Sequence, residues 1–298
     1  MEVTLGTKRL EVGSNQLGLL HSCNDVLHNV DALRTRMEED GYLVMRGLLN
    51  EVDVRAARAH LLDNLMQNDQ IDERWPLDDA VIKPDRHGAF LGGRTDISHS
   101  RPFLDVVESP ELFGFFASFL GHDALTFDYK WLRVVGTNGF TGAHYDIVYM
   151  GRGTQKLYTC WIPLGNVAFD QGPLAILVGS HKGDGFQRVR DTYGRMDVDR
   201  DNVEGWFSSD PLEMVDRYGG KWHTSEFKAG DVVVFGMYTM HASLVNTTNR
   251  YRLSCDVRFQ RSDEPTDERW VGDRPIGHYA WGKQPGVTME EARERWKV

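Results

Sequence analysis

The chain of 298 residues has no apolar run of about 18 residues, the length that a membrane-spanning helix needs. Its first residues lack the basic and apolar regions of a signal peptide. Cysteine is scarce: Cys23, Cys160 and Cys255 are far apart and form no CxxC pair, which argues against a disulfide framework. We therefore expect a cytoplasmic protein in which Cys160 and Cys255, both in strand-like runs, are buried thiols.

The chain also lacks positive net charge. It has 34 Lys and Arg residues against 44 Asp and Glu residues, a net charge of −10. This balance argues against nucleic acid or an anionic membrane as a partner and leaves a small molecule as the expected one. The sequence has no internal repeat, no low-complexity segment and no evident linker. We predict one domain over residues 1–298, long enough for a substantial core.

A short motif near the middle of the chain carries the first indication of chemistry. Residues 142–146 read Gly-Ala-His-Tyr-Asp. In a β-strand, residues i and i+2 point to the same face, so His144 and Asp146 would project side by side. An imidazole and a carboxylate are two of the three ligands in the two-His, one-carboxylate set of non-haem Fe(II) oxygenases. The pair alone does not establish a metal site, because His-x-Asp is common by chance.

The third ligand candidate follows ninety-five residues later. After the apolar run Val232–Phe235 comes His241, and Arg252 lies eleven residues beyond it in an alternating segment. One face of that segment is apolar and the other polar, as expected for a barrel wall with outer helices on one side and a site on the other. The apolar face consists of Tyr251, Leu253, Cys255, Val257 and Phe259, and the polar face of Arg250, Arg252, Ser254, Asp256 and Arg258.

This combination resembles the phytanoyl-CoA dioxygenase family of Fe(II)/2-oxoglutarate oxygenases over roughly residues 30–260. His144, Asp146 and His241 match the metal triad of the family. Arg252 matches the arginine that pairs with the far carboxylate of 2-oxoglutarate, and Ser243 the hydroxyl beside that carboxylate.

Other segments support the resemblance. Trp161 matches a tryptophan on the strand that follows the first half of the triad. Thr159, on the same strand, and Arg133, near the end of an earlier one, are further candidates for contact with the cofactors. The segment from Gly172-Pro173-Leu174 to Gly179-Ser180-His181-Lys182 resembles a family motif in which Pro173 replaces a glycine. Asp40–Gly47 resembles the opening strand of the family.

The resemblance implies a mainly β fold: a double-stranded β-helix, or jelly-roll barrel of the cupin type, with flanking N-terminal helices. It also implies Fe(II), with 2-oxoglutarate on two metal positions and O₂ on the third, and with succinate and CO₂ as products. The usual outcome is hydroxylation of an unactivated C–H bond. Halogenating relatives lack the triad carboxylate so that chloride can bind, and Asp146 therefore favours hydroxylation or a related desaturation, cyclisation or epoxidation.

Local patterns predict the individual elements. Helices are expected from Val30 to Gly41, from Asn50 to Gln67, from Ser109 to Leu120 and after the capping box Thr288-x-x-Glu291. Strands are expected at 125–135, 142–149, 156–164, 231–235 and 250–260. The polar segment 183–225 is a candidate lid or substrate-recognition insert, in which Trp206 and Trp222 would close over substrate or pack in the insert's own core. Residues 261–298 form a C-terminal extension.

Two other interpretations fit parts of the pattern. A cupin-type isomerase or zinc hydrolase could use two histidines and an aspartate, but it would not need Arg252 and Ser243 at this spacing. A non-catalytic β-sandwich binding protein could hold His144 and His241 as structural residues. The sequence indicates neither the substrate nor the oligomeric state.

Overall fold

The computed structural model describes residues 1–91, 93–280 and 286–298. Its principal strands are β1 Glu2–Leu5, β2 Lys8–Glu11, β3 Leu17–Leu19, β4 Tyr42–Met45, β5 Ala89–Phe90, β6 Ala124–Thr126, β7 Trp131–Val135, β8 Tyr158–Pro163, β9 Leu174–Val178, β10 Lys221–Thr224, β11 Val232–Gly236, β12 His241–Ser243 and β13 Arg252–Arg261. Its α-helices include α1 Val30–Asp40, α2 Glu51–Gln67, α3 Thr95–Ser98, α4 Arg101–Val107, α5 Pro110–Leu120, α6 Ile147–Met150, α7 Gln187–Asp191, α8 Val198–Asp201, α9 Pro211–Tyr218 and α10 Met289–Trp296.

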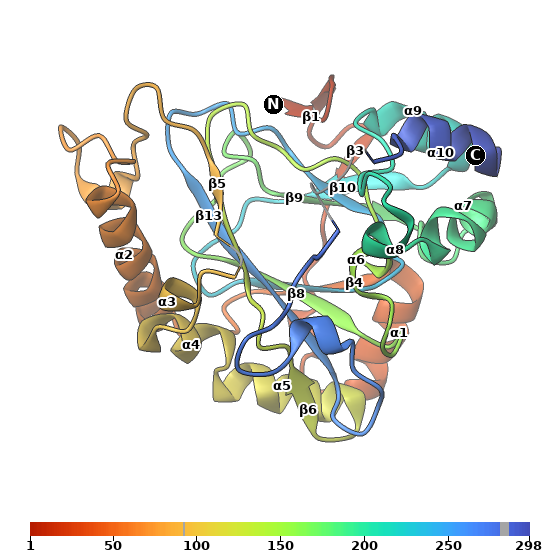
Figure 1. The fold of residues 1–298 in the computed structure, drawn as a ribbon, viewed down its shortest axis with the longest axis horizontal. Helices are drawn as coiled ribbons and strands as arrows, with labels where there is room; N and C mark the ends of the chain where they lie inside the picture. Colours follow the sequence, from red (N-terminus) through yellow and green to blue (C-terminus); the bar gives the residue numbers. More distant parts are fainter. Residues whose placement is uncertain (92, 281–285) are drawn as a thin grey trace.

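Two sheets enclose the interior of the molecule (Figure 1). The larger sheet has the strand order β4-β11-β8-β13-β7-β5, with β6 also paired to β13, and the smaller one has the order β12-β9-β10-β3. An antiparallel bridge between His144 and His241 adds the segment around His144 to the edge of the smaller sheet. This is the predicted double-stranded β-helix.

Strand β13 shows how the sequence builds the wall of this barrel. Its apolar face packs with residues of α2, α4 and α5 into one core, as the alternation predicted. Phe259, fully buried, stacks on Phe116 of α5 with ring centroids 4.1 Å apart. The opposite face, from Arg252 to Gln260, is polar and equally buried. A strand that is buried on both faces but charged on one of them indicates an enclosed polar interior.

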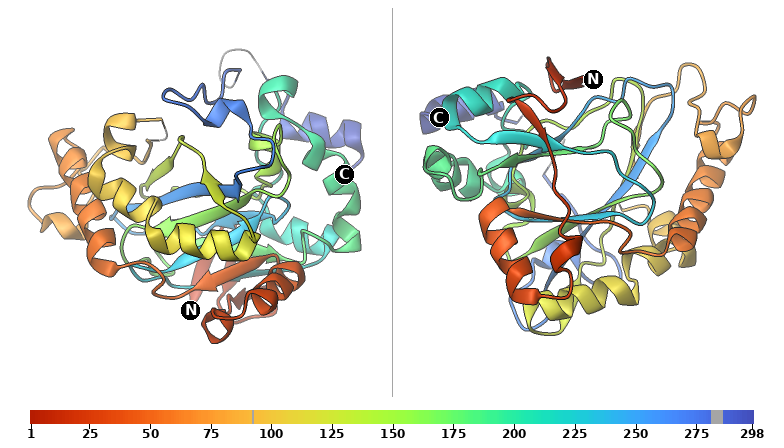
Figure 2. Two further views of the ribbon diagram at one scale, coloured as in Figure 1. Left: turned by 90° about the horizontal axis from the view of Figure 1, so that it is seen from below. Right: turned by 180° about the vertical axis from the view of Figure 1, so that it is seen from behind.

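Helices α1, α2 and α5 begin and end where the sequence predicted, whereas the short helices α3 and α4 were not predicted. The Asn29 side chain accepts a hydrogen bond from the Ala32 N–H, and the helix ends at Gly41, whose φ of 80° suits glycine. The Asn50 and Ser109 side chains cap α2 and α5 in the same way. The views in Figure 2 show these helices covering the larger sheet, whereas α7, α9 and α10 group together near the C-terminus.

Two strand predictions need correction. The strand expected at 125–135 is divided into β6 and β7. The strand expected at 142–149 is limited to isolated bridges at Ala143 and His144, after which Asp146 adopts helical angles (φ −69°, ψ −25°) and α6 begins. The chain turns here because the amide of Ile147 bonds to the carbonyl of Met237 and does not continue the ladder.

The segment 183–225 is only partly an insert. Its last residues form β10, which pairs with β9 and β3 as a regular strand of the smaller sheet. Trp222 lies on β10 with no exposed surface, and its indole N–H donates to the Pro211 carbonyl over 2.9 Å. The prediction that Trp222 closes over substrate is therefore wrong. Trp222 packs in a core, as the alternative held, but this core includes residues of the smaller sheet and is not the insert's own. Trp206, by contrast, is 40% exposed.

Among the described residues, no helix is both long and apolar enough to span a bilayer. Cys23, Cys160 and Cys255 are all buried free thiols, as the sequence predicted for the last two.

Candidate metal centre

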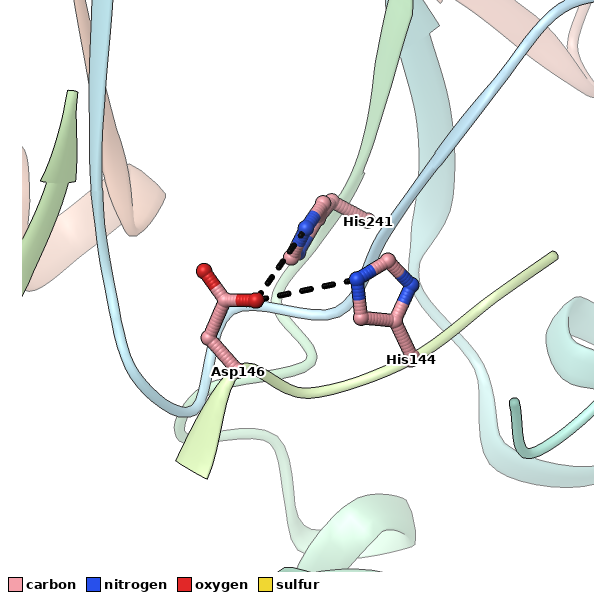
Figure 3. Close-up of side chains that lie close together, drawn as sticks. All are labelled: His144, Asp146 and His241. Carbon is pink, nitrogen blue, oxygen red and sulfur yellow. Dashed lines mark ion pairs between the residues drawn. The ribbon is translucent and has the colours of Figure 1, made fainter. Parts of the chain in front are cut away.

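The side chains of His144, Asp146 and His241 converge on one point inside the barrel (Figure 3). The Asp146 Oδ1 atom lies 3.6 Å from Nε2 of His144 and 3.7 Å from Nε2 of His241. One potential ligand atom from each residue lies within 4.8 Å of the other two, and all three residues are buried. The triad proposed from the sequence is thus a compact group of two nitrogens and one oxygen, the donor set of a facial triad.

The backbone fixes which nitrogen each histidine presents. Nδ1 of His144 lies 2.8 Å from the carbonyl oxygen of Gly142, and Nδ1 of His241 lies 3.1 Å from that of Thr239. Each Nδ1–H donates to its carbonyl, which leaves Nε2 with a lone pair directed at the common centre. Burial, together with the neighbouring His144, lowers the pKa of His241 to about 3. Its ring is therefore neutral at physiological pH, the form that binds metal.

Asp146 is held in its ionised form. Burial alone raises the pKa of its carboxyl group, but the Arg258 guanidinium and the two imidazoles outweigh burial and hold the pKa well below its usual range. Nη2 of Arg258 lies 3.1 Å from Asp146 Oδ2, and the Thr159 hydroxyl donates to the same oxygen. Thr159, expected to contact the cofactors, here bonds to a candidate metal ligand.

Arg252 is a buried cation without an acidic partner. It is 2% exposed, and among the described residues no carboxylate lies within ion-pair distance of it. Its Nη1–H donates to the Ser254 hydroxyl, while its Nε has no hydrogen-bond partner there. Burial and the neighbouring Arg133 lower the pKa of Arg252 to about 10. An arginine in this state is suited to a carboxylate supplied by a ligand.

The other predicted cofactor contacts occupy distinct places. The Ser243 hydroxyl is buried and accepts a hydrogen bond from the Thr141 N–H over 2.9 Å. Trp161 is buried beside Phe227, with ring centroids 4.8 Å apart. Arg133 pairs with Asp256 over 2.6 Å and lines the pocket described next.

A pocket of about 270 Å³ opens beside the triad. Arg133 and Arg258 contribute guanidinium groups to its wall. Most of the remaining lining is aromatic or apolar, and two of these residues, Trp206 and His278, come from outside the barrel. The full lining is Trp131, Arg133, Thr141, His144, Asp146, Tyr149, Met150, Trp206, Arg258 and His278.

Residues 197–206 and 267–280, which we call the cap, carry Trp206 and His278 to this pocket. The Arg269 guanidinium, 2% exposed, lies 2.6 Å from Asp199 and 2.6 Å from Asp267. Asp199 also lies 3.0 Å from Nδ1 of His278 and accepts the backbone N–H groups of residues 279 and 280. Buried charges thus join the predicted insert to the C-terminal extension, of which residues 281–285 lie outside the described residues.

Sequence reasoning missed several pocket residues. Arg258 was assigned to the correct face of its strand, but its contact with Asp146 was not predicted. No sequence signal indicated His278, a single histidine in an irregular segment. Lys130, three residues before Arg133 in the chain, does not line the pocket and is buried against the Phe127 carbonyl and Glu108.

The sequence matches the phytanoyl-CoA dioxygenase (PhyH) family over residues 37–254, most of the chain. The protein belongs to the phytanoyl-CoA dioxygenase family. As a member, it is an Fe(II)/2-oxoglutarate-dependent oxygenase, and the triad matches the metal ligands of that class. The 1-deoxypentalenic acid 11-beta-hydroxylase of Streptomyces exfoliatus is 25% identical over 251 residues, which are 80% of this chain and 83% of the hydroxylase.

Solved structures agree with the fold. The carbocyclase SnoK of nogalamycin biosynthesis is 20% identical and superposes with a TM-score of 0.56, over 88% of this chain and 94% of SnoK. The epimerase SnoN of nogalamycin biosynthesis, solved with Fe³⁺, alpha-ketoglutarate and nogalamycin RO, is 16% identical with a TM-score of 0.56, over 87% of this chain and 95% of SnoN. Both are alike in architecture to the barrel described here.

Proposed function

We propose that this family member hydroxylates a C–H bond of a small, largely apolar organic molecule. His144, Asp146 and His241 would hold Fe(II), and Arg252 with Ser243 would hold the far carboxylate of 2-oxoglutarate. The observation that carries these roles is the buried Arg252, which has no acidic partner within the described part of the chain. It lies in the same interior as an ionised Asp146 and two imidazoles directed at one point. When bound, iron, 2-oxoglutarate and O₂ supply an oxidant for C–H bonds and release succinate and CO₂.

The residues of the chain would orient the reactants and exclude water. A guanidinium can bind a carboxylate through two parallel hydrogen bonds, which fixes the cosubstrate in direction as well as in place. Trp161 and Arg133 would support this arrangement from the larger sheet, and Thr159 would contribute through its hydrogen bond to Asp146. The ionised Asp146 occupies the place where chloride binds in halogenating relatives, and it therefore favours hydroxylation.

The pocket supports the substrate class. Its volume of about 270 Å³ and its wall of Trp131, Tyr149 and Met150 suit a compact apolar skeleton. Arg133, at the same wall, suits an acidic or hydrogen-bond-accepting group on that skeleton. The Streptomyces exfoliatus relative acts on 1-deoxypentalenic acid, as its name states, and that compound is a reasonable first probe.

We further propose that the cap acts as a lid. It contributes Trp206 and His278 to the pocket. One part of it lies in the segment 183–225 that the sequence indicated as a lid, and the other lies in the C-terminal extension 261–298. Closure over bound substrate would exclude water from the reaction. The single domain of residues 1–298 and the cytoplasmic location, which suits three buried free thiols, also remain proposals.

Succinate release tests the function directly. Wild-type protein with Fe(II), ascorbate, O₂ and 2-oxoglutarate should release succinate, faster with a small apolar carboxylic acid that it accepts. The product should be heavier by one oxygen atom. His144→Ala should lower both metal affinity and turnover more than about 100-fold. Mutating residues that only orient metal ligands already lowers metal affinity or activity about 10- to 100-fold, and loss of a ligand itself should have a larger effect.

Product analysis separates this proposal from its rivals. The solved neighbours include an epimerase and a carbocyclase, so succinate release without an added oxygen would point to one of those reactions. Wild-type protein that binds Fe(II) but neither binds nor consumes 2-oxoglutarate would favour a cupin-type isomerase or hydrolase. Protein that binds no metal would favour a binding protein.

A further inference from the structure

Arg258 occupies an unusual position beside the triad. It lies on the inner face of β13, opposite Thr159 in the strand register, and is 1% exposed. Its Nη2 lies 3.1 Å from Asp146 Oδ2, its Nε lies 3.1 Å from the Met150 sulfur, and its guanidinium carbon lies 4.5 Å from the centroid of the Trp131 ring. These contacts fix the guanidinium group from three sides.

The two oxygens of Asp146 have separate partners. Oδ1 faces Nε2 of His144 and of His241, while Oδ2 accepts hydrogen bonds from Arg258 and from the Thr159 hydroxyl. A carboxylate whose second oxygen is engaged in this way can offer one oxygen to a metal ion. A carboxylate free to rotate could offer both and would occupy one of the positions that the cosubstrate and O₂ require.

We propose that Arg258 and Thr159 are positioning residues that restrict Asp146 to ligation through one oxygen. We also propose that Arg258 binds a small anion in place of the Asp146 carboxylate when that side chain is removed. This inference rests on the proposed function, since it assumes that the triad binds metal. The charge-assisted bond from Arg258 supplies most of the constraint, and the Thr159 hydroxyl fixes the plane of the carboxylate.

The anion site follows from the charge of Arg258. Among the described residues Asp146 is the acidic group within ion-pair distance of Arg258, and the buried Nη1 of Arg258 has no hydrogen-bond partner. Removal of the Asp146 carboxylate would leave a desolvated cation beside the metal position, which is costly unless an anion replaces it. A small carboxylate from solution would then be drawn to the place that the side chain left.

The first test measures metal affinity without catalysis. Mn(II) is titrated in the presence of 2-oxoglutarate, and the free ion is followed by electron paramagnetic resonance. Arg258→Met and Thr159→Val should each weaken Mn(II) binding, the arginine variant by about 10- to 100-fold, as outer-shell changes generally do. Arg258→Lys should restore part of the affinity, because it keeps the charge. Arg261→Met is the matched control, since Arg261 ends the same strand and pairs with Asp263 over 2.7 Å.

The outcomes are distinct. Wild-type protein that binds no Mn(II) with 2-oxoglutarate would overturn the proposed function itself. Wild-type affinity in folded Arg258→Met and Thr159→Val would overturn the positioning roles alone. If Arg258→Met does not fold, the Mn(II) affinity of Thr159→Val decides whether Asp146 needs these positioning contacts, because valine keeps the shape of the threonine side chain. A raised 2-oxoglutarate KM in Thr159→Val at unchanged Mn(II) affinity would assign Thr159 to the cosubstrate and overturn its proposed role.

The second test uses formate as the anion. Asp146→Gly should lose Mn(II) affinity and regain it when formate is added. The double variant Asp146→Gly with Arg258→Met should not respond, because it lacks the cation that attracts the anion. Equal recovery in both variants, or recovery in neither, would overturn the anion site.

Discussion

The wall of the pocket and its cap are built by different forces. The wall consists of barrel strands, in which backbone ladders and an apolar core behind them hold the polar face of β13 in place. The cap is joined by buried charges, with Arg269 between Asp199 and Asp267 and with Asp199 beside His278. The triad belongs to the wall and its immediate neighbours, whereas Trp206 and His278 belong to the cap.

This difference separates two tasks. Metal ligands must keep their geometry within fractions of an ångström, and regular strands with a packed core provide that rigidity. Residues that contact substrate can lie on segments outside the barrel, which vary without disturbing the chemistry. Charge-dependent joints also make the cap sensitive to acid.

The largest expected effect on stability comes from the apolar support of the wall. Phe259→Ala should lower the free energy of unfolding by about 3–5 kcal/mol, because it removes a fully buried ring that stacks on Phe116. Urea unfolding measures this change. The 2-oxoglutarate KM of the molecules that remain folded should be unchanged, and a large KM shift would show that the outer face also tunes the site.

The next effect concerns the polar face of the same strand. Arg252→Ala should raise the 2-oxoglutarate KM by a factor that corresponds to about 2–5 kcal/mol, the usual loss when a buried charge pair is broken, while Mn(II) affinity stays nearly intact. Steady-state succinate release gives the KM. Arg250→Ala is the control, since Arg250 is half-exposed and pairs with Asp79 at 3.2 Å. If Arg250→Ala had the larger effect, the cosubstrate role would move to Arg250.

The cap should respond to acid. Burial raises the pKa of Asp197, but its bond to Arg152 and nearby donors outweigh burial and lower the pKa from 3.8 to about 2. A lowered folded-state pKa stabilises the protein above about pH 4 and loses this contribution as the pH falls through 2. Asp197→Asn, which keeps the helix cap, should therefore cost about 1–2 kcal/mol at pH 6, since water partly screens the pair, and only a small fraction of that near pH 2. Urea unfolding at both pH values measures the change. An equal loss in the free energy of unfolding at both would show that the charge of Asp197 does not stabilise the cap.

The smallest effect separates two tryptophans of one segment. Trp206→Ala should barely change the melting temperature, because the side chain is partly exposed. It should raise the KM for an accepted carboxylic acid by about three- to tenfold, the equivalent of an aromatic contact of about 0.5–1.5 kcal/mol, at constant 2-oxoglutarate KM. Trp222→Ala should instead destabilise the fold, as Phe259→Ala does. An unchanged substrate KM in Trp206→Ala would contradict the prediction that Trp206 contacts substrate as part of the lid.

The sequence by itself determined the features that depend on local periodicity and spacing. The two-residue alternation over residues 250–259 is enough to separate the core face of β13 from its polar face, because side chains alternate between the two sides of any strand. The caps at Asn50 and Ser109 marked the starts of two helices, because such side chains satisfy backbone groups within a few residues. The order of His144, Asp146, His241, Ser243 and Arg252 indicated the chemistry through its resemblance to one family.

Only the tertiary structure decided how these residues meet. The bridge between His144 and His241 brings two distant parts of the chain into contact, and it lets Asp146 turn into a helix yet still face both rings. Arg258 lies opposite Thr159 because β13 pairs with β8, and both side chains bond to Asp146. His278 reaches the pocket because Asp199, in another segment, binds it. Strand pairing and ion pairs between distant segments leave no periodic trace in a sequence. The contact of Arg258 with Asp146 and the place of His278 in the pocket were therefore not predictable from local pattern.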